Sequence, residues 1–417
     1  MSQNSSVVFN TSMIHPEYRV LTTMLNNYIT KETSRAKSRK DVPPGEMSKL
    51  LSQVLSFLPE HRKFVWDSNI NGINVRYTGN SEHQYDFWRE NWWPAPNNRE
   101  SLPHAFVYSV IGVPDMEPQA FYSPQLNTAL FVNTEYYGQA KSWALGMAAA
   151  ILERYYNTHS IHGACAEVEG KGVVIVAPTG TGKTTQVNKL FQHDSGKVVG
   201  DDWVYIEHPA NLKSGVGHRF KVRQPERRLY VRTENEENEP WLRPILDGCK
   251  CENVVVKKEN CQNQKCWDRC QNGERKCVFD EGREWCFYAF GNSRALLPRE
   301  WMSGEAKVGD SATLNLIALL RRDSTSPAQV NLDPDEAIQV LLEGSYMIRP
   351  GAGPKEKWGT MAQEPWYNPY LLVRDDRKQE EFFRREIEPS RCILLNTGVE
   401  GIQQTHDRTL KELRKAT

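Results

Sequence analysis

The chain has 417 residues, of which 52 are Lys or Arg and 52 are Asp or Glu, so its formal net charge is zero. A chain of this length can form one large or two medium domains, and its balanced charge argues against a nucleic-acid partner. The N-terminal sequence lacks the charged and apolar segments of a secretory signal, and no apolar run approaches the ~18–20 residues of a membrane span. We therefore expect a cytoplasmic protein with no membrane partner.

The first 140 residues divide into two predicted regions. Residues 1–60 are polar and predict an N-terminal helical segment, with a loop between helices over the charged residues 31–40 and the Val-Pro-Pro-Gly sequence of residues 42–45. Residues 61–140 predict an N-terminal α/β domain, because short β-type runs alternate with Pro-rich turns. The clearest of these runs are Ile73–Tyr77 and Ala105–Ile111.

Residues 141–417 predict a nucleotide-binding domain. An Ala-rich helix, of the kind that is usually buried, is expected over residues 135–156 and leads into this domain. The apolar run Gly172–Val176 predicts a buried strand. A glycine-rich turn, a helix over residues 184–192 and a strand over residues 197–206 follow. Strand, turn, helix and strand in this order form a mononucleotide-binding unit.

The glycine-rich turn reads APTGTGKT from Ala177 to Thr184 and fits the P-loop pattern GxxxxGK[ST], except that alanine replaces the first glycine. Glycines let the backbone curl so that successive N–H groups face one anion, and the next helix adds its positive N-terminal end. The alternative is an ordinary glycine-rich turn that is followed by a lysine by chance. The flanking strand and helix disfavour this alternative. The predicted nucleotide-binding residues are Thr179, Gly180, Thr181, Gly182, Lys183, Thr184 and Thr185.

Two adjacent carboxylates, Asp201 and Asp202, follow an apolar run that ends at Gly200. Mg²⁺ prefers hard oxygen ligands, which are usually one or two carboxylates together with substrate phosphates. One aspartate could hold the metal with the Thr184 hydroxyl, while the other orients or deprotonates a hydroxyl nucleophile. A solvated turn is the alternative, and the nearby P-loop pattern favours the functional interpretation.

These motifs resemble those of ATP-dependent phosphoenolpyruvate carboxykinase. The family's GTGKTT and GDD motifs are present as Gly180–Thr185 and Gly200–Asp202. HPr kinase, which has a related fold, shares the His-Gly, P-loop and Asp-Asp elements but not the later blocks. Weaker blocks stand in the family's order at residues 134–142, 161–166, 291–298, 332–337 and 394–398.

The resemblance implies a carboxykinase-like α/β fold, with an N-terminal α/β domain and a P-loop domain, that uses ATP and Mg²⁺ or Mn²⁺. His162 would be a metal ligand beside Thr184, Asp201 and Asp202. Arg294 would lie on the γ-phosphate, where it neutralises charge in the transition state. Lys141, the first lysine of the family's K-K pair, would be catalytic with Lys183, Arg294, Asp201 and Asp202.

Three departures from the family concern the substrate half of the site. The metal-ligating second lysine of the K-K pair is Ser142, the substrate-binding arginine falls at Asn80, and residues 399–404 replace a Gly-rich segment. We therefore expect an ATP-dependent kinase that acts on a small-molecule acceptor other than oxaloacetate. The alternatives are a divergent true carboxykinase, a protein kinase of the HPr-kinase type and an ATP-binding pseudoenzyme.

A basic stretch follows the two aspartates. Its arginines could face an anionic acceptor, and a solvated strand face explains them equally well. They are Arg223, Arg227, Arg228 and Arg232.

Seven of the nine cysteines fall within residues 248–287, which we expect to form an insertion in the P-loop domain. Structural zinc sites prefer paired short spacings, and only the C-x4-C spacing falls in the common range. An odd number of thiols leaves one over in any disulfide scheme, and a cytosolic chain disfavours disulfides. Zinc, disulfides and unmodified thiols are the alternatives, and in each case the insertion could bind a protein partner. The cysteines are Cys249, Cys251, Cys261, Cys266, Cys270, Cys277 and Cys286.

Overall fold

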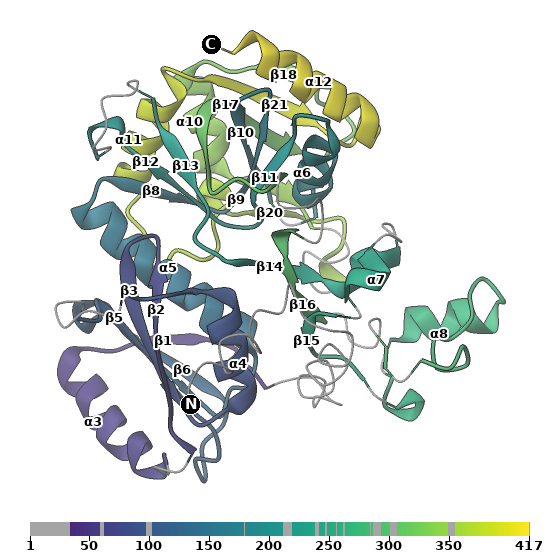
Figure 1. Cartoon of the computed structure of the whole chain (residues 1–417). Helices are drawn as coiled ribbons and strands as arrows, with labels where there is room; N and C mark the ends of the chain where they lie inside the picture. Colours follow the sequence, from purple (N-terminus) through teal and green to yellow (C-terminus); the bar gives the residue numbers. More distant parts are fainter. Residues whose placement is uncertain are drawn as a thin grey trace, which may run out of the picture. The chain divides into compact units, whose positions relative to one another are not determined.

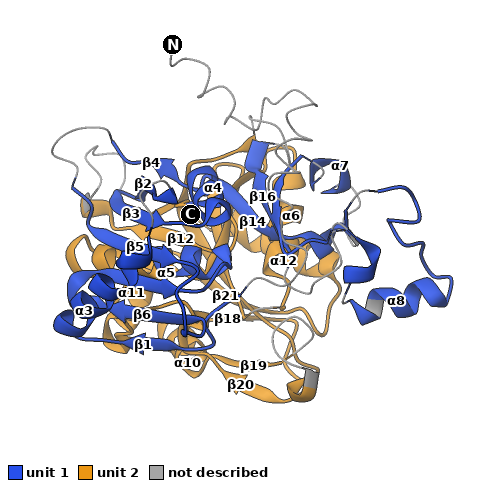
Figure 2. Ribbon diagram, turned by 90° about the horizontal axis from the view of Figure 1, so that it is seen from below, with its two compact units in different colours: residues 1–144, 226–302 blue, residues 145–225, 303–417 orange. Residues whose placement is uncertain are grey.

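The computed structural model has a mixed α/β fold that divides into two compact units (Figure 2). Unit 1 comprises residues 1–144 and 226–302, and unit 2 comprises residues 145–225 and 303–417. The structure describes residues 34–58, 62–96, 102–178, 180–211, 219–237, 242–246, 248–255, 257–261, 263–283, 285–286, 293–300, 307–348 and 355–416. None of the helices in these ranges is both long enough and apolar enough to cross a membrane.

Unit 1 is built on a seven-stranded sheet with the order β1-β6-β7-β5-β3-β2-β4. The β3, β5 and β7 strands run parallel, and β2 and β3 form a hairpin. The expected β-type runs at residues 73–77 and 105–111 are confirmed as β3 and β5. The strands are β1 (Arg39–Asp41), β2 (Phe64–Ile70), β3 (Ile73–Gly79), β4 (Trp93–Pro94), β5 (Ala105–Val110), β6 (Gln119–Ser123) and β7 (Thr128–Val132).

The expected loop between helices is confirmed for residues 34–38 and 42–43, which lie in no helix or strand, and is wrong for the rest of its described range. Residues 39–41 form strand β1, and Pro44 begins helix α3 (Pro44–Val54). Proline is tolerated in the first turn of a helix because the N–H group that it lacks has no partner within the helix there. Residues 1–33 of the expected helical segment lie outside the described residues.

The rest of unit 1 contains helix α4 (Glu82–Asn91), the first part of helix α5 (Tyr137–Tyr155) and a small antiparallel sheet. This sheet has the order β14 (Arg228–Arg232), β16 (Arg294–Pro298) and β15 (Lys250–Glu252). Two short helices, α7 (Arg243–Leu246) and α8 (Gln264–Gln271), belong to the same region. The Cys-rich residues therefore fall in unit 1.

Unit 2 is built on a nine-stranded sheet in which β10, β17 and β21 run parallel to one another. Its main path is β11-β9-β10-β17-β13-β12-β8, and β21 pairs with β17 and β18. The strands are β8 (Thr158–Ile161), β9 (Gly163–Val168), β10 (Lys171–Val176), β11 (Lys197–Gly200), β12 (Val204–Glu207), β13 (Lys221–Arg223), β17 (Ser311–Arg321), β18 (Gln329–Asn331) and β21 (Arg391–Asn396).

Two pairs of helices cover this sheet (Figure 1). The α10 (Pro334–Glu343) and α11 (Asp376–Ile387) helices share a buried core cluster with β10, β17 and β21. The α6 (Lys183–Gln192) and α12 (Ile402–Lys415) helices pack against each other, and both contact β10. The apolar strands are thus buried, as the run at residues 172–176 predicted.

The single strand expected over residues 197–206 is wrong, because the segment forms two strands with different partners. The β11 strand pairs with β9, whereas β12 pairs with β8 and β13. The break lies at residues 201–203, where Asp202 has a positive φ of 83°. The two aspartates therefore lie in a connection between strands, where their side chains are only partly buried.

Candidate functional site

The glycine-rich turn connects the end of β10 to the start of α6. Gly180 and Gly182 have φ angles of +83° and +107°. A Cβ atom at Gly182 would meet no other atom within 4 Å, so the backbone conformation and not the space requires glycine there. No side chain caps the N-terminus of α6, and an anion could accept hydrogen bonds from its first N–H groups. Thr179, one of the predicted nucleotide-binding residues, lies outside the described residues.

Lys183, His162 and Asp202 form a chain of contacts beside this turn. The Lys183 Nζ atom lies 2.8 Å from His162 Nε2, which in turn lies 3.2 Å from an oxygen of Asp202. The His162 Nδ1–H group donates to the Tyr367 carbonyl at 2.7 Å, which leaves Nε2 as the acceptor for the lysine. Burial and the charge of Lys183 lower the pKa of His162. The imidazole is therefore held neutral between a cation and a carboxylate.

The side-chain oxygen atoms of Thr184 and Asp201 lie next to each other. The Thr184 hydroxyl lies 3.1 Å from both carboxylate oxygens of Asp201. No three His, Cys, Asp or Glu side chains in the described ranges are placed to hold a metal ion. Mg²⁺ does not need such a cluster, since it keeps several waters and takes one or two carboxylates plus phosphate oxygens. The donor set of Thr184 and Asp201 fits that ion.

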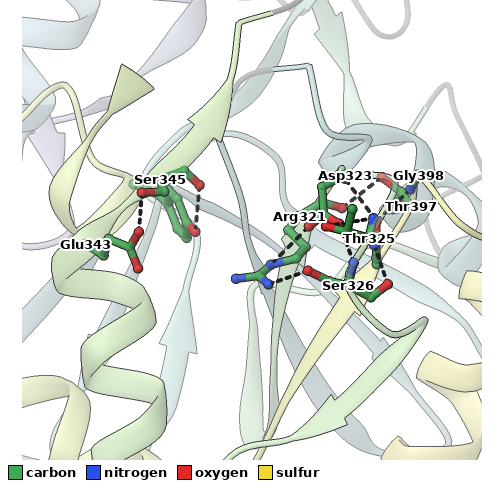
Figure 3. A network of polar contacts seen from close by, with 10 residues as sticks. Arg321, Asp323, Thr325, Ser326, Glu343, Ser345, Thr397 and Gly398 are labelled. Atoms are coloured by element: carbon green, nitrogen blue, oxygen red, sulfur yellow. Dashed lines mark hydrogen bonds and ion pairs between the residues drawn. The ribbon is translucent and has the colours of Figure 1, made fainter. Parts of the chain in front are cut away.

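Two further loops reach the same edge of the sheet, because the parallel strands β10, β17 and β21 end there. Figure 3 shows the network after β17 and β21, which includes Asp323, Thr397 and Gly398. The Asn396 side chain accepts hydrogen bonds from the backbone N–H groups of Asp323 and Gly398. Thr397 Oγ1 lies 2.9 Å from the carbonyl oxygen of Thr181. An Arg322 guanidinium nitrogen lies 3.5 Å from the carbonyl oxygen of Gly180. These loops therefore support the glycine-rich turn.

The residues after β17 were missed by sequence reasoning, whereas residues 394–398, at the end of β21, were identified as a block of the resemblance without a role in the site. The pKa of Asp323 is lowered to about 2, because the N–H groups of Ser326 and Thr325 outweigh the opposing effect of burial. Glu364 is a second missed residue, and burial raises its pKa while the charge of Lys183 partly opposes the rise. The strand-end rule could have indicated the loops, but only with the strand order known.

Lys141 and Arg294, the other predicted catalytic residues, belong to unit 1 and lie around Tyr230. The Lys141 ammonium is buried, 3.2 Å from Glu226 and 5.2 Å from the centre of the Tyr230 ring. The Arg294 guanidinium lies 5.9 Å from the centre of the same ring. The two cations therefore share one aromatic ring within unit 1.

Asn80 and Ser142, which depart from the carboxykinase pattern, form hydrogen bonds with backbone groups. Asn80 exchanges two hydrogen bonds of 2.8 Å with the backbone of Ile111. Ser142 donates to the Gly138 carbonyl within its own helix at 2.8 Å. Both side chains therefore have structural hydrogen bonds in place of the charged contacts that the family's residues would make.

The cysteines of the Cys-rich region are not paired in disulfides. All nine cysteines lie in described ranges, and none is joined to another by a disulfide. Cys261, Cys266, Cys270, Cys277 and Cys286 line one cavity of about 10 Å³, which is too small for a ligand. Burial raises the pKa of Cys266 to about 11, which disfavours the reactive thiolate. Because no three ligands converge in the described ranges, the zinc alternative gains no support.

Comparison with known proteins assigns no family to the chain. No protein-family model matches it, and no curated protein matches it significantly.

Proposed function

We propose that the chain is an ATP- and divalent-metal-dependent phosphotransferase with a carboxykinase-like P-loop fold, acting on a small-molecule acceptor. One observation carries the proposal: the contact chain of Lys183, His162 and Asp202 lies next to the Thr184–Asp201 pair. A lysine, a hydroxyl and two carboxylates at the end of a glycine-rich turn are the groups that bind a metal–triphosphate.

The residues have separate roles in this reaction. The N–H groups of the turn and the Lys183 ammonium bind the β- and γ-phosphates. Thr184 and Asp201 would hold Mg²⁺, and the bound ion would neutralise charge on the phosphates. Asp202 accepts the proton of an acceptor hydroxyl as that oxygen forms its bond to the γ-phosphorus and ADP leaves.

The neutral His162 has a positioning role. It accepts a hydrogen bond from Lys183 and donates one to the backbone of Tyr367, so it holds the lysine in front of the turn. Fixing the ammonium before the nucleotide arrives reduces the side-chain entropy lost on binding.

The test is ADP release by the full chain with Mg²⁺ or Mn²⁺ and a pool of metabolites. Lys183→Ala should abolish turnover and weaken ATP binding while the thermal unfolding midpoint stays unchanged. Lys189→Ala is the matched control, because Lys189 lies on the same helix and contacts Gln403 at the surface. Full turnover in Lys183→Ala would contradict the site.

The acceptor class is tested in the same assay. Phosphoenolpyruvate formed from oxaloacetate and Mn·ATP would indicate a true carboxykinase, and label on a protein band in a lysate would indicate a protein kinase. ATP binding without turnover in any pool would indicate a pseudoenzyme.

A further inference from the structure

Unit 1 contains a cavity of about 200 Å³ that the proposed phosphotransferase site does not use. It lies between strand β2, helix α4 and the segment that enters β14. Drug-sized ligands occupy pockets of roughly 300–1,000 Å³, so this cavity suits a smaller molecule. Its lining includes Trp66, Asp86, Arg89, Glu90, Arg227 and Lys250. We call it the Arg227 pocket.

The two carboxylates of the pocket are already neutralised by cations. Asp86 lies 2.6 Å from the Lys250 ammonium. Glu90 lies 2.8 Å from the buried guanidinium of Arg228. Each carboxylate is therefore paired directly with another cation, and Glu90 and Glu300 act on the Arg227 guanidinium only from beyond ion-pair distance.

Arg227 carries positive charge that these carboxylates do not pair with directly. Its backbone N–H donates to the Asn91 carbonyl at 2.7 Å, and its guanidinium lies 5.6 Å from the centre of the Trp93 ring. The structure places no carboxylate of the described residues within ion-pair distance of this guanidinium. Burial and the adjacent charge of Arg228 lower the pKa of Arg227, so an anion would stabilise its charged form.

Trp66 and Arg89 form another side of the pocket, where the guanidinium lies against aromatic rings. The Arg89 guanidinium lies 4.9 Å from the centre of the Trp66 ring and 5.3 Å from that of Tyr85. Guanidinium groups stacked on aromatic rings lose little further freedom when they bind a planar oxyanion.

We propose that the Arg227 pocket binds a small anion through a carboxylate or phosphate group that pairs with the Arg227 guanidinium. The planar fork of arginine matches the two oxygens of such a group with two parallel hydrogen bonds. Of the four arginines in the basic stretch of the sequence, Arg227 is then the one that binds the anion. The other three, Arg223, Arg228 and Arg232, each pair with a glutamate. The inference concerns unit 1 alone and does not depend on the phosphotransferase proposal.

Calorimetric titration of the full chain tests the proposal, with inorganic phosphate and benzoate as probes at constant ionic strength. The titrations are made in a Lys183→Ala background, so that phosphate bound by the glycine-rich turn does not contribute. We expect saturable binding of at least one probe, and the preferred probe identifies the anionic group. Absence of saturable binding of both probes would overturn the proposal.

Three variants locate the binding. Arg227→Gln should weaken it by roughly tenfold or more, because a charge-assisted pair is lost. Arg227→Lys should keep part of the affinity, since it retains the charge without the fork. Arg223→Gln is the control and should bind as the parent does. Equal affinity of Arg227→Gln and the parent would refute the assignment.

Folding of the Arg227→Gln variant is checked by circular dichroism. If it does not fold, the Arg227 Nε–H resonance of the parent protein is followed during the titration. A saturable shift of this resonance supports the proposal, and an unchanged resonance contradicts it.

Discussion

The Lys183 ammonium lies 2.8 Å from the Nε2 atom of His162, a residue of the connection between β8 and β9. The lysine of the glycine-rich turn is thus positioned by a side chain 21 residues earlier in the chain. Because the other ring nitrogen of His162 donates to the Tyr367 carbonyl, both ends of the imidazole are fixed. The relationship makes His162 a positioning residue whose protonation state controls the lysine.

His162→Ala is expected to weaken ATP binding by roughly tenfold, because Lys183 loses the acceptor that holds it. His162→Gln should restore part of the affinity, since an amide can accept from the lysine and donate to Tyr367. Binding is measured by titration with Mg·ATP. Equal affinities of His162→Ala and the parent would exclude the positioning role.

The same histidine predicts a pH dependence. Burial and Lys183 lower the pKa of His162, so the folded protein keeps the imidazole neutral below the ordinary histidine pKa of about 6.5. Affinity for Mg·ATP should therefore not change between about pH 8 and 6.5 through this group. The stability that the neutral imidazole contributes is lost only as pH falls below about 6.5 toward the folded pKa. A His162-dependent loss of affinity above pH 7 would contradict this assignment.

Asn80→Ala should lower the free energy of unfolding by about 1–3 kcal/mol, because it leaves the backbone N–H and C=O of Ile111 without their partners. Urea denaturation followed by fluorescence measures the change. Asn331→Ala, at an exposed strand position, is the control and should stay within about 0.5 kcal/mol of the parent. A similarly small effect at Asn80 would show that its two hydrogen bonds do not stabilise the fold.

How far the sequence predicts the structure depends on whether the signal is local. The strand before the turn and helix α6 were predicted because an apolar run and a glycine-rich turn are local patterns. The break at residues 201–203 was not predicted, because apolar residues that favour strands stand on both sides of Gly200, Asp201 and Asp202. The two halves of residues 197–206 pair with strands that are distant in the sequence, and pairing of this kind is decided by tertiary packing.

In the candidate site, too, only the residues of a local pattern could be predicted from the sequence. Lys183 and Thr184 could be predicted from one motif. Thr397, which contacts the turn, is 216 residues away from its partner Thr181, and the block at residues 394–398 gives no indication of that contact. Only the parallel order of β10, β17 and β21 brings it to the edge where β10 ends.

The cysteines predict a pattern of chemical labelling. Cys165 and Cys392 are buried, and burial raises the pKa of Cys392 to about 12. Both should be alkylated only after unfolding, whereas Cys261, Cys270 and Cys277 are partly exposed and should be labelled in the native protein. Mass spectrometry of labelled peptides measures this order. Dialysis against a chelator should leave the unfolding midpoint unchanged, and a marked drop would instead support a structural zinc ion.

A buried polar network in unit 2 predicts a second pH effect, this time on stability. His159 donates from Nδ1 to Glu386 at 2.9 Å, and its other ring nitrogen lies 3.0 Å from Gln379, which donates to Glu153. Burial alone would lower the pKa of His159, but the charge of Glu386 and the hydrogen bond to it outweigh burial, so this pKa is raised. Burial raises the pKa values of Glu153 and Glu386 as well, with His159 partly opposing.

All three raised pKa values favour the folded protein at low pH over high pH. A raised histidine pKa contributes stability that is fully present below about pH 6.5 and is lost as pH rises through the folded pKa. A raised glutamate pKa likewise favours the folded protein at low pH and disfavours it as pH rises above about 4.5. The network should therefore stabilise unit 2 more near pH 6 than near pH 9.

His159→Asn isolates this contribution, because asparagine can still donate to Glu386 but does not titrate. The difference in free energy of unfolding between the parent and His159→Asn, measured by urea denaturation, should be larger near pH 6 than near pH 9. His193→Asn, at a histidine near the surface that contacts Ser195, is the control for the general effect of removing a histidine. If the free-energy difference between the parent and His159→Asn stayed constant or grew with pH, the imidazole would be neutral in the folded protein. Glu386 would then be stabilised by hydrogen bonding without the histidine charge.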